Sequence, residues 1–499
     1  MTRMLDVQGY NPRTGAPVGP AVAASTAEEV DRAANAAAAT FPVWSGLPAQ
    51  RRAEVLDALA DALDATAGEL VAVADAETAL GETRLRNEVG RTTGQLRMFA
   101  DLLRRGRHVE AIISPADPAA GRPDVRRMLH PIGPVAVFSA SNFPMAFSVA
   151  GGDTASALAA GCPVVVKAHE GHPQTSVLVA RTLGQALAGA GLPTEILGLV
   201  HGFDAGGALV RHPAVRAVGF TGSLRGGRAL ADLAAARPDP IPFYGELGSV
   251  NPVVVLPGAA RTRATEIAAE YAGSLTLGAG QFCTNPGLLF VPDDADLLAA
   301  LADAVRSTSA GPMLSKRMRD SYVDVTARMA GDALHPLAEG AAADGAWAVA
   351  PQVWRLDLAT FAARVDTLTE EVFGPAGLVV SYSTVDDLLP VLSRLDGSLT
   401  GSVHAADDEP DAAAAVGAAL RPLVGRLIYN GWPTGVAVCW AMHHGGPWPA
   451  STSALHTSVG GTALRRWQVP VAYQGWPQDL LPAELRDDNP LGIPRTVQD

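Results

Sequence analysis

The sequence predicts an α/β protein whose parallel sheets are built from βαβ units. From Pro131 onward, short apolar runs alternate with helical stretches, which is typical of parallel strands covered by helices. The chain has 499 residues, more than one hydrophobic core supports, so two or three domains are expected. Apolar residues make up 48% and charged residues 18%, the composition of a globular protein with large buried elements.

The composition also limits the partners and the compartment. A net charge of −13 argues against nucleic acid or an anionic membrane as a partner. The three cysteines, Cys162, Cys283 and Cys439, are few and lack metal-ligand spacing, so we expect a reducing compartment, no disulfide framework and no metal site. The start of the chain lacks a signal-peptide pattern, and no apolar run is long enough to cross a membrane. We therefore expect a soluble cytoplasmic protein.

The first hundred residues are predicted to be mostly helical. Ser25-Thr26-Ala27-Glu28 is a capping box that would open a helix to about Ala39. Two further helices are expected over 49–65 and 84–105. Prolines 115, 118 and 123 then break the helical pattern, which favours a protruding connection at this point.

Strands and helices are expected to alternate after this connection. The expected strands are 135–138, 163–167, 196–200, 214–220, 252–256, 288–291, 378–381 and 426–429. The expected helices are a stretch ending at 160, then 176–190, 263–274, 295–305 and 316–329. Residues 331–346 are predicted to be an irregular surface segment, and the tail from Pro470 an extended arm. Ligands bind at the carboxyl ends of parallel strands, and Asn142, Lys167 and Ser223 each follow an expected strand.

Cys283 is the candidate nucleophile. It follows the glycine-rich Leu277-Gly278-Ala279-Gly280, where backbone N–H groups can crowd a reacting atom, and a thiolate is a strong nucleophile near neutral pH. A lone cysteine is more often a small buried residue, so it needs catalytic partners elsewhere. By themselves, Asn142 fits a turn and Glu246 fits a charged strand end.

Six blocks in order carry a resemblance to one family: Ser141-Asn142-Phe143-Pro144, Val166-Lys167, Gly219-Phe220-Thr221-Gly222-Ser223, Gly245-Glu246-Leu247-Gly248, Gly280-Gln281-Phe282-Cys283 and Glu370-Glu371-Val372-Phe373-Gly374-Pro375. Over almost its whole length the chain resembles the NAD(P)-dependent aldehyde dehydrogenases. This resemblance implies the aldehyde dehydrogenase fold, with a Rossmann-like cofactor domain, an α/β catalytic domain and a β-arm for oligomerisation.

The resemblance also implies domain bounds. The cofactor-binding domain would comprise 1–108 and 130–245, and the catalytic domain 246–463. Residues 109–129 and 464–499 resemble the oligomerisation arm and the C-terminal tail, and family members are generally homodimers or homotetramers. The sequence does not choose between those two assemblies.

Several further motifs resemble the 2-oxoglutarate semialdehyde (2,5-dioxovalerate) branch of the family: 167–169, 248–252, 282–287, 430–435 and 489–492. The small-molecule substrate would then be an aldehyde oxidised to 2-oxoglutarate. Relatives that act on fatty aldehydes share several of these motifs, so a fatty or other aliphatic aldehyde is the alternative. A cation should bind the carboxylate of a 2-oxo acid; Arg91, Arg97, His443 and His444 are the candidates.

The resemblance assigns catalytic roles to three residues. Cys283 would attack the aldehyde to form a thiohemiacetal and then a thioester. Asn142 would stabilise the oxyanion together with the Cys283 backbone N–H. Glu246 would be the general base for hydrolysis. A CoA-acylating dehydrogenase would not need this base, and a non-catalytic protein would need none of the three. Cys162 and Cys439 are expected to be small apolar structural residues near strands.

NADP or NAD is the implied cofactor. The resemblance places Lys167 and Glu170 at the adenosine ribose, Ser223 at the pyrophosphate, and Glu371 with Phe373 at the nicotinamide ribose. Glu170 should favour NAD by repelling a 2′-phosphate. Lys167 with His169 or His172 could instead hold that phosphate, and the branch often prefers NADP; we predict NADP use with NAD tolerated.

Overall fold

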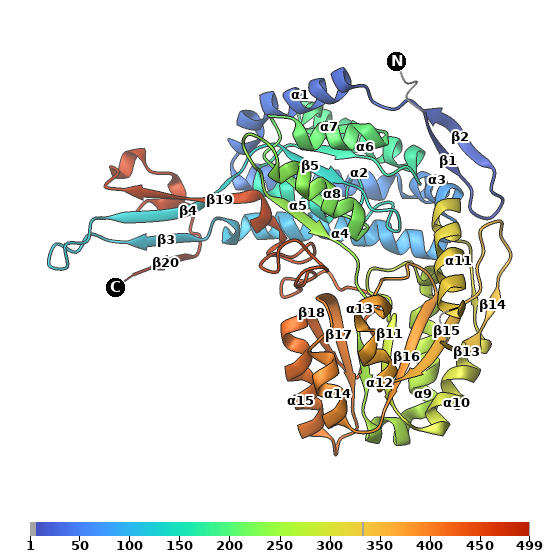
Figure 1. Ribbon diagram of the computed structural model, residues 1–499. Coiled ribbons are helices and arrows are strands. Elements are labelled where there is room, and N and C mark those ends of the chain that lie inside the picture. Colours follow the sequence, from blue (N-terminus) through green and yellow to red (C-terminus); the bar gives the residue numbers. More distant parts are fainter. Residues whose placement is uncertain (1–5, 332–333, 499) are drawn as a thin grey trace.

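The computed structural model describes residues 6–331 and 334–498. Figure 1 shows two lobes and an arm that projects from the upper lobe. Each lobe is built around one main sheet, of five strands in the upper lobe and seven in the lower, and a four-stranded sheet forms the arm. Within the described ranges, no helix has the length and apolar character needed to cross a membrane.

The upper lobe contains a parallel sheet with strand order β7-β6-β5-β8-β9. Its strands are β5 (Val135–Phe138), β6 (Val164–Lys167), β7 (Leu197–Val200), β8 (Ala217–Thr221) and β9 (Phe243–Glu246). The helices of this lobe are α1 (Ala27–Ser45), α2 (Ala49–Ala65), α3 (Ala67–Thr78), α4 (Glu82–Arg104), α5 (Gly152–Ala160), α6 (Pro173–Gly189), α7 (Phe203–Arg211) and α8 (Leu224–Ala235). Helices α3 and α7 and the hairpin of β1 (Val7–Tyr10) and β2 (Pro17–Val22) were not predicted from the sequence.

Helix α1 differs from its prediction at both ends. The capping box is one residue later than expected: Thr26 Oγ1 accepts a 3.2 Å hydrogen bond from Glu29 N, and Glu29 Oε2 accepts one from Thr26 N. The helix continues past Pro42 to Ser45. Trp44 explains this extension, because its side chain is fully buried and its Nε1 donates to Leu158 O at 3.0 Å.

The lower lobe contains a seven-stranded sheet with the order β13-β15-β16-β11-β10-β17-β18. Its strands are β10 (Val253–Val255), β11 (Leu288–Pro292), β13 (His335–Glu339), β15 (Gln352–Asp357), β16 (Ala376–Tyr382), β17 (Ser398–His404) and β18 (Val424–Tyr429). The helices are α9 (Pro257–Thr276), α10 (Ala295–Arg306), α11 (Lys316–Gly331), α12 (Leu358–Ala363), α13 (Val365–Leu368), α14 (Val385–Leu392) and α15 (Pro410–Leu420).

The prediction of an irregular segment over 331–346 was wrong for its described part. His335–Glu339 forms β13, an edge strand that pairs antiparallel with β15. Ala341–Ala342 forms β14 and pairs with β12 (Ser309–Ala310). An alanine-rich run has weak strand propensity, so pairing with a neighbouring strand decided this segment; residues 332–333 lie outside the described residues.

The arm joins two segments that are far apart in the sequence. Its strand order is β19-β4-β3-β20, with β3 (Ala111–Ser114), β4 (Val125–Pro131), β19 (Gln468–Gln474) and β20 (Arg495–Val497). Figure 1 shows the C-terminus beside β3, away from both lobes. The tail begins at the upper lobe, where Trp467 is fully buried in the core.

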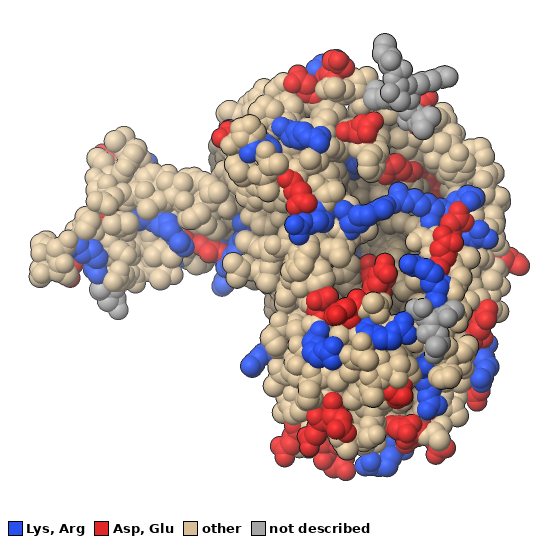
Figure 2. Space-filling view, viewed as in Figure 1, with Lys and Arg blue, Asp and Glu red and all other residues tan. Residues whose placement is uncertain are grey.

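A cleft of about 620 Å³ lies between the lobes. Both lobes line it: Ser141 and Thr221 belong to the upper lobe, whereas Arg317 and Ser321 lie on α11. Figure 2 shows the hollow, with basic side chains along its rim. The carboxyl ends of the upper strands open onto this cleft.

Candidate active site

Cys283 lies in the loop between α9 and β11 and lines the interlobe cleft. The loop packs tightly onto the segment 371–375. Gly280 has φ +67°, and a Cβ at this position would collide with the backbone of Gly374 and Pro375. Only glycine therefore allows the loop to approach this closely.

Asn251 fixes the backbone of the thiol residue and of the turn that follows it. Its Nδ2 donates 2.9 Å hydrogen bonds to the carbonyls of Cys283 and Asn285. Its Oδ1 accepts from Ser249 Oγ and from the Thr400 hydroxyl. In the sequence, Asn251 stood out only as part of the motif 248–252. Its left-handed backbone conformation, with φ +50°, is visible only in the structure.

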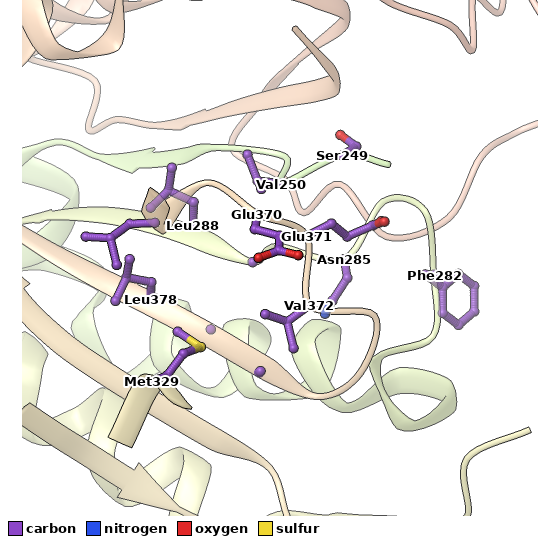
Figure 3. Close-up of a pocket in the computed structure, with 14 residues that line it drawn as sticks. Ser249, Val250, Phe282, Asn285, Leu288, Met329, Glu370, Glu371, Val372 and Leu378 are labelled. Carbon is purple, nitrogen blue, oxygen red and sulfur yellow. The ribbon is translucent and has the colours of Figure 1, made fainter. Parts of the chain in front are cut away.

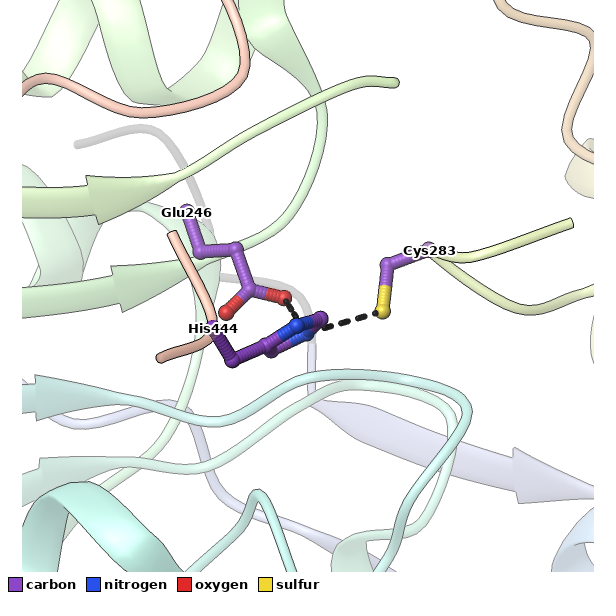
Figure 4. A group of neighbouring side chains, drawn as sticks. All are labelled: Glu246, Cys283 and His444. Atoms are coloured by element: carbon purple, nitrogen blue, oxygen red, sulfur yellow. Dashed lines mark hydrogen bonds and ion pairs between the residues drawn. The ribbon is translucent and has the colours of Figure 1, made fainter. Parts of the chain in front are cut away.

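Three side chains from distant segments meet at the thiol (Figure 4). His444 Nε2 lies 3.5 Å from Cys283 Sγ and 3.1 Å from Glu246 Oε1. Glu246 stands at the end of β9, and its Oε2 accepts a hydrogen bond from Ser458 Oγ. His444 and Glu246 are almost completely buried, whereas Cys283 reaches the cleft.

The two acidic groups of this cluster have opposite pKa shifts. Burial and the negative charge of Glu246 raise the pKa of the Cys283 thiol well above its ordinary value. Burial alone would also raise the pKa of Glu246, but His444 and the hydrogen bond from Ser458 outweigh it and lower that pKa. At neutral pH the site therefore holds a thiol beside a carboxylate, with an imidazole between them.

The position of His444 corrects its predicted role. From the sequence, His444 was a candidate only for binding the substrate carboxylate. Its side chain is fully buried beside Glu246, and its backbone N–H donates to Thr457 Oγ1 at 2.7 Å. The glycines after it, Gly445 and Gly446, contact other backbone segments so closely that a Cβ would clash. A histidine followed by two glycines was the only sequence signal for this placement.

Asn142 also lies at the cleft, as the oxyanion role requires. Its Nδ2 donates a 2.9 Å hydrogen bond to the carbonyl of Gln281, two residues before the thiol. An amide nitrogen carries two hydrogens, so one remains for a ligand. Arg84 holds the same loop, because its Nη2 donates to Asn142 O at 2.7 Å.

Most of the predicted cofactor residues line the same cleft: Glu170, Ser223, Glu371 and Phe373. Ser223 is the N-cap of α8, and its Oγ accepts from Gly226 N. Lys167 does not line the cleft. Its side chain is largely buried and its Nζ forms an ion pair with Glu170.

Glu371 lies between two cavities. It lines the cleft and also a small internal cavity of about 30 Å³, shown in Figure 3 beside Ser249 and Val250. Burial raises the pKa of Glu371 to about 7; a hydrogen bond from the Ser249 backbone opposes this shift, and the charge of Glu246 adds to it. A substantial fraction of Glu371 is therefore protonated at neutral pH.

The two histidines near Lys167 are neutral. Burial lowers the pKa of His169 to about 3, and burial also lowers the pKa of His172. His172 is also occupied, because its Nε2 bonds to Ala140 O at 2.9 Å. Arg317 on α11 faces His169 from the other lobe and lowers its pKa further.

The two arginines that were candidates for binding the substrate carboxylate lie in different environments. Arg97 is an exposed residue paired with Asp61 and Asp64, so the structure removes it from the site. The guanidinium of Arg91 lies 5.5 Å from the centre of the Phe143 ring and 5.3 Å from that of Phe147. Its Nε and Nη2 are buried and have no hydrogen-bond partner among the residues that the structure describes. Burial lowers the pKa of Arg91, while the charges of Glu88, Cys283 and Glu246 oppose that shift.

The other two cysteines differ from each other. Cys162 is fully buried, burial raises its pKa to about 12, and its Sγ donates to Trp467 O. This position fits the predicted structural role. Cys439 does not fit it, because this residue is exposed in an irregular loop and not packed near a strand.

Comparisons with known proteins show the family to which this chain belongs. The model of the aldehyde dehydrogenase family matches residues 3–460. The chain is 45% identical to alpha-ketoglutaric semialdehyde dehydrogenase 2 of Azospirillum brasilense, over 98% of this chain and 95% of that protein. It is 41% identical to alpha-ketoglutaric semialdehyde dehydrogenase of Acinetobacter baylyi, over the same shares.

A solved structure supports the fold. Aldehyde dehydrogenase C of Pseudomonas syringae, crystallised with NAD⁺ and octanal, superposes with a TM-score of 0.81 at 24% identity. The alignment covers 95% of this chain and 94% of that one. The predicted fold class is thereby confirmed. This chain belongs to the aldehyde dehydrogenase family and is an oxidoreductase that oxidises aldehydes with NAD(P)⁺.

Proposed function

We propose that this enzyme oxidises 2-oxoglutarate semialdehyde to 2-oxoglutarate. The observation that carries the proposal is the meeting of Cys283, His444 and Glu246 at the cleft, with the unpaired guanidinium of Arg91 close by. The names of the two relatives at 45% and 41% identity support the choice of substrate.

Cys283 is the nucleophile in this proposal. Because its pKa is raised, it needs a base to remove its proton, and His444 Nε2 lies 3.5 Å from the sulfur. The thiolate attacks the aldehyde carbon and forms a C–S bond, while the carbonyl oxygen becomes an oxyanion. The free N–H of Asn142 and the backbone N–H of Cys283 stabilise this oxyanion.

The cleft fits a nicotinamide dinucleotide in size and in the groups that line it. Ser223 at the α8 N-terminus would hold phosphate, and Glu371 and Phe373 would hold the ribose near the thiol. Glu170, held by its ion pair with the largely buried Lys167, would bind the adenosine ribose. When bound, the oxidised nicotinamide accepts the hydride that the tetrahedral adduct releases, and a thioester remains on Cys283.

Glu246 is the general base for hydrolysis of this thioester. Its Oε2 accepts from Ser458, and its Oε1, which lies 3.1 Å from His444 Nε2, can accept a proton from water. The lowered pKa keeps the carboxylate ionised at neutral pH. Hydrolysis releases the acid and restores the thiol.

Arg91 is the proposed anchor for the substrate carboxylate. Its stacking on Phe143 and Phe147 orients the guanidinium, and its free N–H groups lack protein acceptors. A substrate carboxylate would accept charge-assisted hydrogen bonds from these N–H groups and would pair with the positive charge of the guanidinium. A fatty aldehyde offers nothing to this cation.

NADP use with NAD tolerated stays a prediction. The neutral histidines weaken the predicted phosphate contact, and Glu170 would repel a 2′-phosphate. Arg317, which lines the cleft, supplies a positive charge from the opposite lobe. The Arg317→Gln variant should therefore lose affinity for NADP and keep its affinity for NAD.

We also propose that the enzyme is a cytoplasmic homodimer or homotetramer with the domain bounds expected from the sequence. β18 and β19 are edge strands with exposed apolar residues, Tyr429 on β18 and Val471 on β19. Unpaired apolar edges favour strand pairing between subunits. All three cysteines are free, as is usual in a reducing compartment. Light scattering on the purified protein measures the assembly.

An aldehyde panel with each cofactor tests the substrate. 2-Oxoglutarate semialdehyde should give the highest kcat/KM, and mass spectrometry should show 2-oxoglutarate formed without CoA. A higher kcat/KM for a fatty aldehyde would overturn the substrate assignment. A strict requirement for CoA would overturn the hydrolytic step.

A further inference from the structure

We propose that Cys283, His444 and Glu246 form a zinc-binding site, through which free Zn²⁺ reversibly inhibits the enzyme. Each residue offers one ligand atom, and the three atoms lie within 4.8 Å of one another. Thiolate, imidazole and carboxylate are the side chains that zinc prefers in proteins. The site is not visible in the sequence, because its ligands come from three distant segments.

Two of the three ligand separations fit tetrahedral zinc, and the third, between Cys283 Sγ and the Glu246 carboxylate, is no more than 4.8 Å. Zinc binds sulfur at about 2.3 Å and nitrogen or oxygen at about 2.0–2.1 Å, so a tetrahedral site separates its S and N ligands by about 3.5 Å and its N and O ligands by about 3.3 Å. The corresponding distances here are 3.5 Å between Cys283 Sγ and His444 Nε2, and 3.1 Å between His444 Nε2 and Glu246 Oε1. Small side-chain rotations would suffice for binding.

The charges of the site also balance. Zinc would displace the thiol proton of Cys283 to solvent and form a Zn–S bond, and the Glu246 carboxylate would supply an oxygen ligand. One dication then faces two anions and a neutral imidazole. Cys283 reaches the cleft, so water can occupy the fourth position. The sulfur lone pair that attacks the aldehyde is held by the metal, and inhibition is competitive with aldehyde.

The surroundings of His444 predict a reversible inhibitor and not a resident metal. Histidines of resident zinc sites donate their second ring N–H to an acceptor, which fixes the ring and strengthens binding. His444 Nδ1 is buried and has no hydrogen-bond partner within residues 6–331 and 334–498. Chelation should therefore restore activity fully.

Titration of the chelator-treated enzyme with Co²⁺ and Zn²⁺, in a phosphine reductant and without aldehyde, tests the proposal. We expect one Co²⁺ per chain with the near-ultraviolet charge-transfer absorbance of a sulfur–cobalt bond, and displacement of cobalt by Zn²⁺. Zinc should inhibit at the same stoichiometry, and EDTA should reverse the inhibition. Absence of the sulfur–cobalt band, or inhibition that persists after EDTA treatment, would overturn the site.

Variants assign the ligands. His444→Gln should weaken zinc binding roughly 100-fold or more, since removing a ligand costs more than disturbing its support. His443→Gln and Cys439→Ser, which change neighbouring metal-binding residue types, should leave zinc affinity unchanged. Equal affinity in His444→Gln and the parent would place zinc elsewhere and refute the proposal. The titration contains no substrate, so an error in the aldehyde assignment leaves its outcome unchanged.

Discussion

Asn251 holds the nucleophile through its backbone: Asn251 Nδ2 donates a 2.9 Å hydrogen bond to the carbonyl oxygen of Cys283. The asparagine is fully buried just before β10, so the lower sheet fixes the position of the loop. The arrangement of Cys283, His444 and Glu246 thus depends on a residue that touches none of the reacting atoms. Removing this contact should disturb the reaction geometry and leave the chemical groups intact.

Asn251→Gly should therefore lower kcat about 100-fold, the cost expected for a displacement of about 1 Å. Glycine accepts the positive φ of this residue, so the backbone can keep its conformation. Asn489→Gly is the matched control, because Asn489 also has positive φ but lies in the tail. Equal kcat losses in both variants, measured per cofactor-binding site, would refute the role of Asn251.

His444→Gln should lower kcat/KM by about 10²–10⁴-fold at pH 7, because the thiol loses its proton acceptor. Burial and Glu246 raise the pKa of Cys283, so the thiolate of the variant forms only as the pH rises. Activity of the variant should increase steeply with pH, while the parent shows a flatter profile. His443→Gln controls for the change of residue type. A parallel pH profile in parent and variant would contradict this role.

Ser458→Ala tests the state of Glu246. The hydrogen bond from Ser458 lowers the pKa of this carboxyl, so its removal should raise that pKa. The base acts when ionised, and the acidic limb of the kcat profile should therefore move to higher pH. Glu246→Gln should release one reduced cofactor per subunit in a burst and then turn over about 10²–10⁴-fold more slowly. A Glu246→Gln enzyme without this burst would mean that Glu246 acts before the thioester forms.

Arg91→Gln should raise the KM for 2-oxoglutarate semialdehyde about 10- to 100-fold, since charge-assisted hydrogen bonds contribute about 1.5–3 kcal/mol. The KM for pentanal, a neutral aldehyde of the same chain length, should change little. Arg97→Gln is the control, because Arg97 is paired on the surface with Asp61 and Asp64. Equal effects of Arg91→Gln on both aldehydes would rule out the anchor.

His404 should make the fold sensitive to acid. Burial and the charge of Arg263 lower its pKa from 6.5 to about 4, although a backbone contact with Gly431 opposes the shift. Between these values the unfolded chain binds a proton that the folded chain does not. The free energy of unfolding should therefore decrease by about 1.4 kcal/mol for each unit by which the pH falls in this range. The total decrease should be about 3 kcal/mol.

The comparison of His404→Leu with the parent across pH 7.5 to 5 measures this contribution by denaturant unfolding. In the variant, the slope of the unfolding free energy against pH should be smaller by the contribution of about one proton. His335→Leu, at an exposed histidine, should retain the slope of the parent. An unchanged slope in His404→Leu would assign the acid sensitivity to other groups.

The regular elements followed closely from local patterns. The helix expected over 49–65 is α2, and the strand expected over 135–138 is β5. Failures occurred where tertiary contacts overrode local preference: Trp44 extended α1, and sheet pairing made a strand of residues 335–339. Strand β17 escaped prediction because its buried Ser398, Ser402 and His404 look like surface residues in sequence.

For the site, the sequence alone determined the residue types. Cys283, Glu246 and Asn142 stand in recognisable motifs: Cys283 follows a glycine-rich loop, Glu246 ends a strand, and Asn142 follows a strand. Only the tertiary structure decided their relations. It placed His444 between thiol and carboxylate, and it separated the unpaired Arg91 from the surface-paired Arg97. The reason is physical: a hydrogen bond or a buried charge depends on distances between segments hundreds of residues apart, and local sequence does not encode those distances.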